Sequence, residues 1–355
     1  MEREPLQIKN IKKVQEIPEI VPLALERKLI SQPALATIDS LISESKFKRS
    51  TTESPNCQLE INGQIYTIET IEYGEHLDIG KIQKLMIDTF GREEIDSEKV
   101  LRAAIDGKTA WGGKDVAKYR VYVLKNKKGE VQSIITGGLL DLKKDGKSTD
   151  KTVFMICYVV TSKEARQEGL AKEIYISSII GAVQEAQKQG KKLSFAAGEC
   201  VFTSERFLNK IGWKRVYGQQ GNNLDTKQEL QYIQPALDFD EKTGKIAEDA
   251  SETSKHLMIG SFESAEPIKE QVAQIVEAFY RWCNKWPREA FKSEEAYQTH
   301  LKYIDEIEKK FKKQLEFLGE LTFLSLEERE ISRKAGMVIH EYKDAEHDNA
   351  KKPKI

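Results

Sequence analysis

The run that bears most directly on chemistry is RQEGLA, which contains Arg166, Gly169 and Ala171. It follows an apolar stretch at 153–160 and precedes apolar residues that recur at helical spacing. The first amides of a helix lack internal partners and carry the positive end of the helix dipole, so they bind phosphate or pyrophosphate. The run therefore indicates an anion-binding helix terminus. From the hexapeptide alone, an ordinary strand–loop–helix crossover is the better interpretation, because short glycine motifs are weak signals.

A second set of reactive side chains follows the apolar residues 192–197. Glu199 is a candidate general base, because a carboxylate in a dry cleft gains a raised pKa. Pairing with a lysine or arginine is an equally good interpretation. Cys200 has the type of a nucleophile, but no histidine is near it in sequence, which favours a small buried thiol. Tyr158 and Tyr175 are candidate proton donors, although most tyrosines in such positions pack.

Composition excludes several classes of protein. Lys+Arg (56) and Asp+Glu (57) give a net charge of −1, so we expect no dedicated nucleic-acid partner. The longest apolar run, 153–160, is far short of the roughly 20 residues of a membrane span, and the polar first residues resemble no export signal. Histidine and cysteine spacing predicts no metal site. We expect a soluble cytoplasmic protein, since no CxxC pair joins its four cysteines (Cys57, Cys157, Cys200 and Cys283).

Periodicity predicts an order of elements. Alternating residues around Asn62 and Gly63 predict a hairpin, because both residues tolerate positive φ. Helical spacing predicts helices over 76–90, 97–106, 170–189 and about 204–211. Strands are expected at 119–125, 131–140, 152–160, 192–197, 213–217 and 256–260, and residues 218–229 are expected to form a loop.

The chain divides into four parts on this pattern. Residues 1–56 form an amino-terminal extension of unclear structure, 57–262 a folded domain, 263–342 a helical extension and 343–355 a charged tail. The extension carries two apolar stripes that predict an αα-hairpin, followed by a third helix at 325–335. The stripes must be buried, either on the same chain or in a homodimer. The same chain is preferred, because folding back costs no association entropy.

The order of elements, together with two separated motifs, resembles the GNAT superfamily of acyl-CoA-dependent N-acyltransferases. The residues Arg166-x-x-Gly169-x-Ala171 match that family's R/Q-x-x-G-x-G/A pyrophosphate loop, after the fourth core strand. Downstream, SERFLNKIGWKRV is similar to the family's A-x-x-F-Y-x-K-x-G-F pattern. The matching residues there are Phe207, Lys210, Gly212 and Trp213, and the resemblance covers about residues 61–260.

The resemblance implies a fold, a cosubstrate and a binding site. The fold is α+β, a mixed and mostly antiparallel sheet flanked by helices, here with a carboxy-terminal helical extension. The cosubstrate is acetyl-CoA or another acyl-CoA, whose pantetheine lies between splayed strands four and five. The backbone of Val159, Val160 and Thr161 then faces the pantetheine and the acyl carbonyl. The pyrophosphate lies on the loop and helix terminus formed by Arg166, Gln167, Glu168, Gly169, Leu170 and Ala171.

One departure from the family pattern bears on mechanism. Leu208 stands where the family has the tyrosine that acts as general acid, and Val201 stands where an asparagine is frequent. The leading hypothesis is transfer of an acyl group, most simply acetyl, to a small-molecule or peptide amine, with Glu199 and Tyr158 as candidate catalytic residues. The alternative is a catalytically degenerate CoA-binding module with a regulatory or interaction role. A nucleotide-binding protein is the weakest hypothesis, because no Walker or GxGxxG sequence is present.

Overall fold

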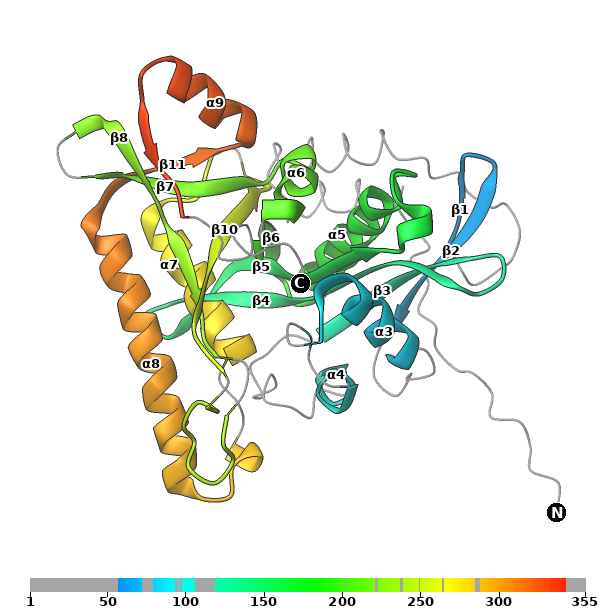
Figure 1. The fold of residues 1–355 in the computed structure, drawn as a ribbon, viewed down its shortest axis with the longest axis horizontal. Coiled ribbons are helices and arrows are strands. Elements are labelled where there is room, and N and C mark those ends of the chain that lie inside the picture. Colours follow the sequence, from blue (N-terminus) through cyan, green and yellow to red (C-terminus); the bar gives the residue numbers. More distant parts are fainter. Residues whose placement is uncertain are drawn as a thin grey trace, which may run out of the picture.

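The structure is a computed structural model (Figure 1). It describes residues 57–71, 79–92, 95, 98–105, 119–200, 202–220, 223–236, 239–248, 250–263, 265–284 and 288–342. The predictions for residues 1–56, for Val201 and for the tail 343–355 lie outside the described residues.

One twisted sheet organises the described chain, and it confirms the predicted α+β class. Its main path runs β1-β2-β3-β4-β5-β6-β10-β7-β8-β12, while β11 pairs with β7 and β9 with β10. Among the described pairings, β5/β6 and β8/β12 are parallel and the others antiparallel. The strands are β1 (Cys57–Ile61), β2 (Gln64–Ile71), β3 (Tyr119–Asn126), β4 (Val131–Lys144), β5 (Lys147–Thr161), β6 (Lys192–Cys200), β7 (Lys214–Gln220), β8 (Asn223–Glu229), β9 (Gln231–Gln234), β10 (Thr253–Ser261), β11 (Leu318–Leu324) and β12 (Val338–His340).

Helices cover both faces of this sheet. Residues of α5 and α6 share a buried apolar cluster on one face, and α3, α4, α7 and α8 share a larger cluster on the other. A one-turn π-helix, Tyr280–Asn284, continues α7, and short 3₁₀ turns lie at Lys163–Ala165 and Arg288–Ala290. The helices are α3 (Ile79–Phe90), α4 (Glu98–Ile105), α5 (Leu170–Lys188), α6 (Phe202–Lys210), α7 (Lys269–Phe279), α8 (Glu294–Phe317) and α9 (Leu326–Lys334).

The first hairpin forms as its turn residues predict. Asn62 and Gly63 have φ values of 53° and 77°, and Ile61 pairs with Gln64 across the two-residue turn. Positive φ at both central positions is the type I′ geometry that matches strand twist. Local turn chemistry therefore sets the register of β1 on β2.

One sequence expectation was wrong, and a second was incomplete. The segment expected to be a loop at 218–229 contains the end of β7 and all of β8, with Tyr217 opposite Glu229. Its polar composition concealed the strand. The extension contains the helices that the sequence predicts, α7, α8 and α9, but β11 and β12 also add to the sheet beside β7 and β8.

The apolar stripes of the extension are buried against the sheet of the same chain. Phe279, Ile304 and Phe311 belong to the cluster that contains Val121 and Leu140 of the central strands. Burying such surface contributes about 25 cal/mol per Å². The described part of the extension therefore shares one core with the preceding strands.

Candidate functional site

Strands β5 and β6 separate towards their carboxyl ends. Their parallel pairing runs from Lys151 opposite Lys192 to Met155 opposite Ala197, and then stops. Strand β5 nevertheless continues to Thr161, paired with β4, and β6 continues to Cys200, paired with β10. The two strands thus leave facing edges without ladder hydrogen bonds to each other, which we call the β5/β6 gap.

A β-bulge in β5 lies at the start of this gap. Thr136 is opposite Tyr158 while Gly137 is opposite Ile156, so Cys157 is the extra residue. A bulge re-aims the side chains that follow it. Cys157 and Tyr158 both pack against the cluster of α3 and α7, whereas Val159 packs on the α5 side.

Hydrogen bonds to β4 show how the backbone of β5 is oriented in the gap. The Ser162 N–H donates to the Gln132 carbonyl at 2.8 Å, and the Ser133 hydroxyl donates to the Val160 carbonyl at 2.9 Å. Alternate residues of an antiparallel strand direct their backbone groups to opposite edges. This alternation directs the groups of Val160 towards β4. Of the three backbones implied by the resemblance, it directs those of Val159 and Thr161 towards the gap.

The first turn of α5 begins at the same end of β5. Gly169 is its N-cap with φ 90°, and no side chain caps the helix there. A Cβ added at Gly169 would meet no atom within 4 Å, so the space before the terminus is open. The backbone hydrogen bonds of the helix begin at Lys172 and Glu173, whose N–H groups donate to the carbonyl oxygen of Gly169. The backbone of Leu170 and Ala171 therefore has the geometry of an anion-binding helix terminus.

Two side-chain hydrogen bonds, made by Arg166 and Glu168, hold the loop that precedes α5. Arg166 is exposed, and its Nε donates to the Thr161 carbonyl at 3.4 Å. Gln167 has φ 69°, in the left-handed region. Glu168 accepts a hydrogen bond of 2.6 Å from the Tyr66 hydroxyl in β2, and burial together with this bond raises the pKa of Tyr66 to about 12. The loop is thus fixed to the sheet through Tyr66 and leaves the Arg166 side chain exposed.

The two candidate catalytic residues lie on the face opposite α5. Glu199 lies on the same face of β6 as Phe195 and Ala197, which belong to the α3 and α7 cluster. The Tyr158 ring lies 6.0 Å from that of Phe90 in α3. Burial raises the pKa of Tyr280 in the π-helix, and the charge of nearby Glu199 adds to this shift. The extension therefore reaches the surroundings of Glu199, which no local sequence signal indicated.

Other candidates belong to the core on the α5 side. Tyr175 is fully buried, its hydroxyl accepts a hydrogen bond of 3.0 Å from Trp213 Nε1, and burial raises its pKa well above the ordinary value. Leu208 in α6 is 5% exposed in the same cluster. Cys200 is buried as well, and the structure brings His256 of β10 directly opposite it. Sequence reasoning missed this neighbour because strand order, not chain proximity, creates it.

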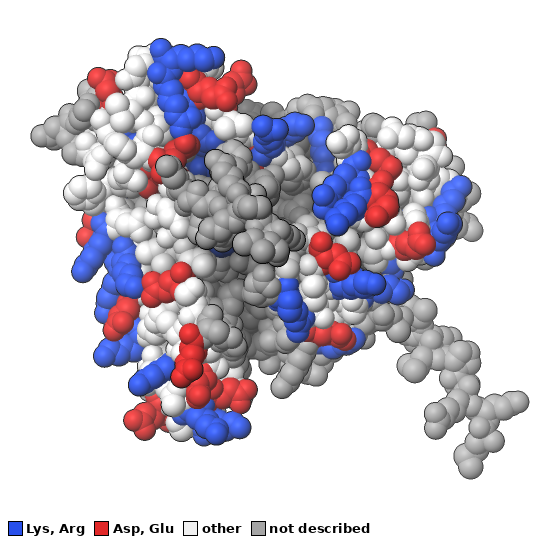
Figure 2. All heavy atoms as spheres, in the orientation of Figure 1, with Lys and Arg blue, Asp and Glu red and all other residues white. Residues whose placement is uncertain are grey.

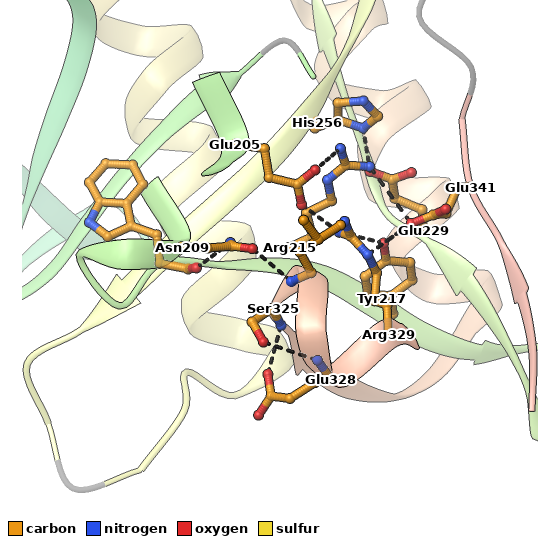
Figure 3. A network of polar contacts seen from close by, with 12 residues as sticks. Glu205, Asn209, Arg215, Tyr217, Glu229, His256, Ser325, Glu328, Arg329 and Glu341 are labelled. Carbon is orange, nitrogen blue, oxygen red and sulfur yellow. Dashed lines mark hydrogen bonds and ion pairs between the residues drawn. The ribbon is translucent and has the colours of Figure 1, made fainter. Parts of the chain in front are cut away.

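A buried charged network lies beside α6 (Figure 3). Glu205 of α6 contacts Arg215 of β7 at 2.5 Å and Arg329 of α9 at 2.6 Å, one through each carboxylate oxygen. Glu229 contacts Arg215 at 3.4 Å and His256 Nδ1 at 2.5 Å. Burial alone would lower the pKa of Arg329, but Glu205 raises it above the ordinary value. The network joins five elements of the chain: α6, β7, β8, β10 and α9.

Three further observations concern surface charge, membrane spans and metal ions. Basic and acidic side chains alternate over the face drawn in Figure 2. No helix in the described part of the chain is both long and apolar enough to cross a bilayer. Within the same ranges, no three His, Cys, Asp or Glu side chains gather as a metal site would need.

No protein-family model matches the chain, and no curated protein matches it. Among solved structures, it is similar to the ribosomal-protein-S18-alanine N-acetyltransferase of Escherichia coli, with 12% identity, a TM-score of 0.32, and coverage of 57% of this chain and 96% of that one. For Arabidopsis thaliana NAA60 in complex with acetyl-CoA the identity is 11% and the TM-score 0.35, over 55% and 98% of the chains. A putative acetyltransferase of Acinetobacter baylyi has 12% identity and a TM-score of 0.33, with coverage of 55% of this chain and 93% of that one.

These three similarities each cover 55–57% of this chain. The strands that separate and the loop–helix junction beside them are features of this chain itself.

Proposed function

We propose that this chain is an acyl-CoA-dependent N-acyltransferase, which in the simplest case transfers acetyl from acetyl-CoA to an amine. The observation that supports it is the β5/β6 gap opening beside the uncapped first turn of α5. The pyrophosphate would lie on the amides of residues 167–171, with Arg166 at the rim. The pantetheine amides would bond to the backbone of Val159 and Thr161, as an added strand does.

The proposed chemistry divides between the two faces of the sheet. Acyl-CoA enters from the α5 side, and the amine approaches from the side of Glu199 and Tyr158. Glu199 accepts the proton that the amine loses as its nitrogen attacks the thioester carbonyl. A backbone N–H in the gap stabilises the oxyanion, and the CoA thiolate then leaves. Leu208 cannot protonate it, so the proton comes from Tyr158 or from solvent.

A pair of glycine variants tests the cosubstrate site. Gly169→Ala and Gly190→Ala each place a side chain at positive φ, 90° and 68°, with no atom within 4 Å, at opposite ends of the α5 region. The strain is similar, about 1–2 kcal/mol. We expect Gly169→Ala alone to weaken acetyl-CoA binding in calorimetry, because it alters the terminus that holds the pyrophosphate. Wild type that binds no acetyl-CoA would refute the proposal, and equal affinities of the two variants would move the site elsewhere.

One observation favours a second candidate, a CoA-binding module without catalysis. Leu208 is packed in the core on the α5 side, so no proton donor occupies the position of the family's acid. Such a module would bind acetyl-CoA as the enzyme does and act on other proteins through its surface. Release of CoA thiol in the presence of a panel of amines separates the two, because the binding module releases none above the hydrolysis background.

A further inference from the structure

The contact between α6 and the carboxy-terminal part of the chain has no role in the chemistry above. Residues 325–342, which include α9 and β12, form what we call the C-terminal clasp. Strand β6 ends at Cys200 and α6 begins at Phe202, so α6 starts at the carboxyl end of the β6 edge of the β5/β6 gap. Helix α6 therefore directly follows the β6 edge of the gap.

The clasp holds α6 at two points. Arg329 Nη1 lies 2.6 Å from Glu205 Oε1, and both side chains are almost fully buried. Asn209, one turn further along α6, accepts a hydrogen bond of 2.6 Å from the backbone N–H of Leu326. The same Asn209 side chain donates to the Trp213 carbonyl at 2.8 Å. These contacts fix both the rotation of α6 and its distance from α9 (Figure 3).

The clasp is itself held rigidly. Ser325 and Glu328 form a reciprocal capping box at the start of α9. Arg329 Nε contacts Glu341 at 3.0 Å, and β12 pairs with β8 in parallel register. The backbone N–H of Tyr342 donates to Glu229 at 2.9 Å. The clasp therefore connects α6 to β8, near the edge of the sheet, through β12.

We propose that the C-terminal clasp fixes α6 as a wall of the acyl-CoA gap, with Arg329 as the positioning residue. The inference rests on the proposed function, since it concerns the same gap. Glu205 is a buried carboxylate, and a buried charge is tolerated only while its partners remain. Without Arg329, Glu205 keeps its contact with Arg215 of β7, but α6 loses its buried side-chain contact with α9, so α6 is free to turn. That rotation changes the gap without touching the residues that bind acyl-CoA.

Two substitutions on one face of α9 test the clasp. Arg329→Met removes the contact with Glu205, whereas Arg333→Met, one turn later, removes only a half-exposed contact with Glu341. Acetyl-CoA affinity is measured by calorimetry, well below the melting temperature of each variant. Amide exchange of residues 202–210 reports on α6. We expect about tenfold weaker binding and faster exchange for Arg329→Met, within the range of coupling between sites, and no change for Arg333→Met.

A double variant keeps the test decisive if Arg329→Met does not fold. Glu205→Gln with Arg329→Met removes the buried charge together with its partner, and should fold while still binding acetyl-CoA weakly. Wild-type affinity and exchange in a folded Arg329→Met or double variant would overturn the clasp and leave the proposed function standing. If wild type itself binds no acetyl-CoA, the proposed function fails, and the exchange of α6 alone decides whether the clasp holds it.

Discussion

The bulge in β5 can be tested at the glycine opposite it. A Cβ added at Gly137 would lie 2.2 Å from the Met155 carbonyl oxygen, 3.2 Å from its carbonyl carbon and 3.3 Å from Ile156 Cα. Ordinary contact begins at 3.4 Å, so β5 would have to move by about 1.2 Å (3.4 − 2.2). All three atoms are backbone and cannot rotate away. Overpacking costs about 1–3 kcal/mol and each lost hydrogen bond about 1 kcal/mol, so we expect Gly137→Ala to lose about 2–4 kcal/mol.

The matched control is Gly146→Ala, in the turn that joins β4 to β5. Gly146 has φ 74° and open space around its Cβ position, so only backbone strain of about 1–2 kcal/mol is expected. Urea denaturation gives the free energy of unfolding of both variants, and calorimetry gives their acetyl-CoA affinity. Because the bulge directs Tyr158 and Val159 to opposite faces, Gly137→Ala should also lose affinity. A Gly137→Ala protein no less stable than Gly146→Ala would show that the close approach of the strands has been misread.

Three further substitutions have defined outcomes. Glu199→Gln should lower turnover by about 10²–10⁴-fold in steady-state assays with unchanged acetyl-CoA affinity; unchanged turnover would exclude Glu199 as the base. Leu208→Ala should cost about 2–5 kcal/mol in denaturation, as buried leucines do, without changing the pH profile of turnover, since leucine carries no proton; a shifted profile would contradict this. Burial alone would raise the pKa of Glu341, but Arg329 and the Tyr217 hydroxyl lower it below the ordinary value. Its stabilising contribution is present above the unfolded pKa of about 4.3 and is lost as pH falls below it. Denaturation midpoints should therefore fall less steeply with acid in Glu341→Gln, and identical slopes would argue against the contribution of Glu341.

Sequence reasoning worked where short-range signals decide the structure. The Asn62–Gly63 turn, the apolar run that became β5 and the glycine at the start of α5 are each specified by neighbouring residues. Pairing between strands that are far apart in the chain could not be predicted from the sequence. No sequence signal near Cys200 indicates that His256 lies opposite it. The sequence of β8 is too polar to be recognised as a strand without its pairing to β7. The orientation of the backbone at Val160 also depends on the bulge, which requires knowledge of β4.

The strand order has a consequence for how the chain acquires its fold during synthesis. Strand β10 lies between β6 and β7, and β7 completes its pairing only with β11, about one hundred residues later in the chain. Closing such long loops before their contacts form slows folding. As the chain leaves the ribosome, β6 therefore has an unpaired edge until Thr253–Ser261 has emerged, and β7 has one until Leu318–Leu324 has emerged. We expect this interval to be the period in which the nascent chain most needs protection from edge-to-edge association.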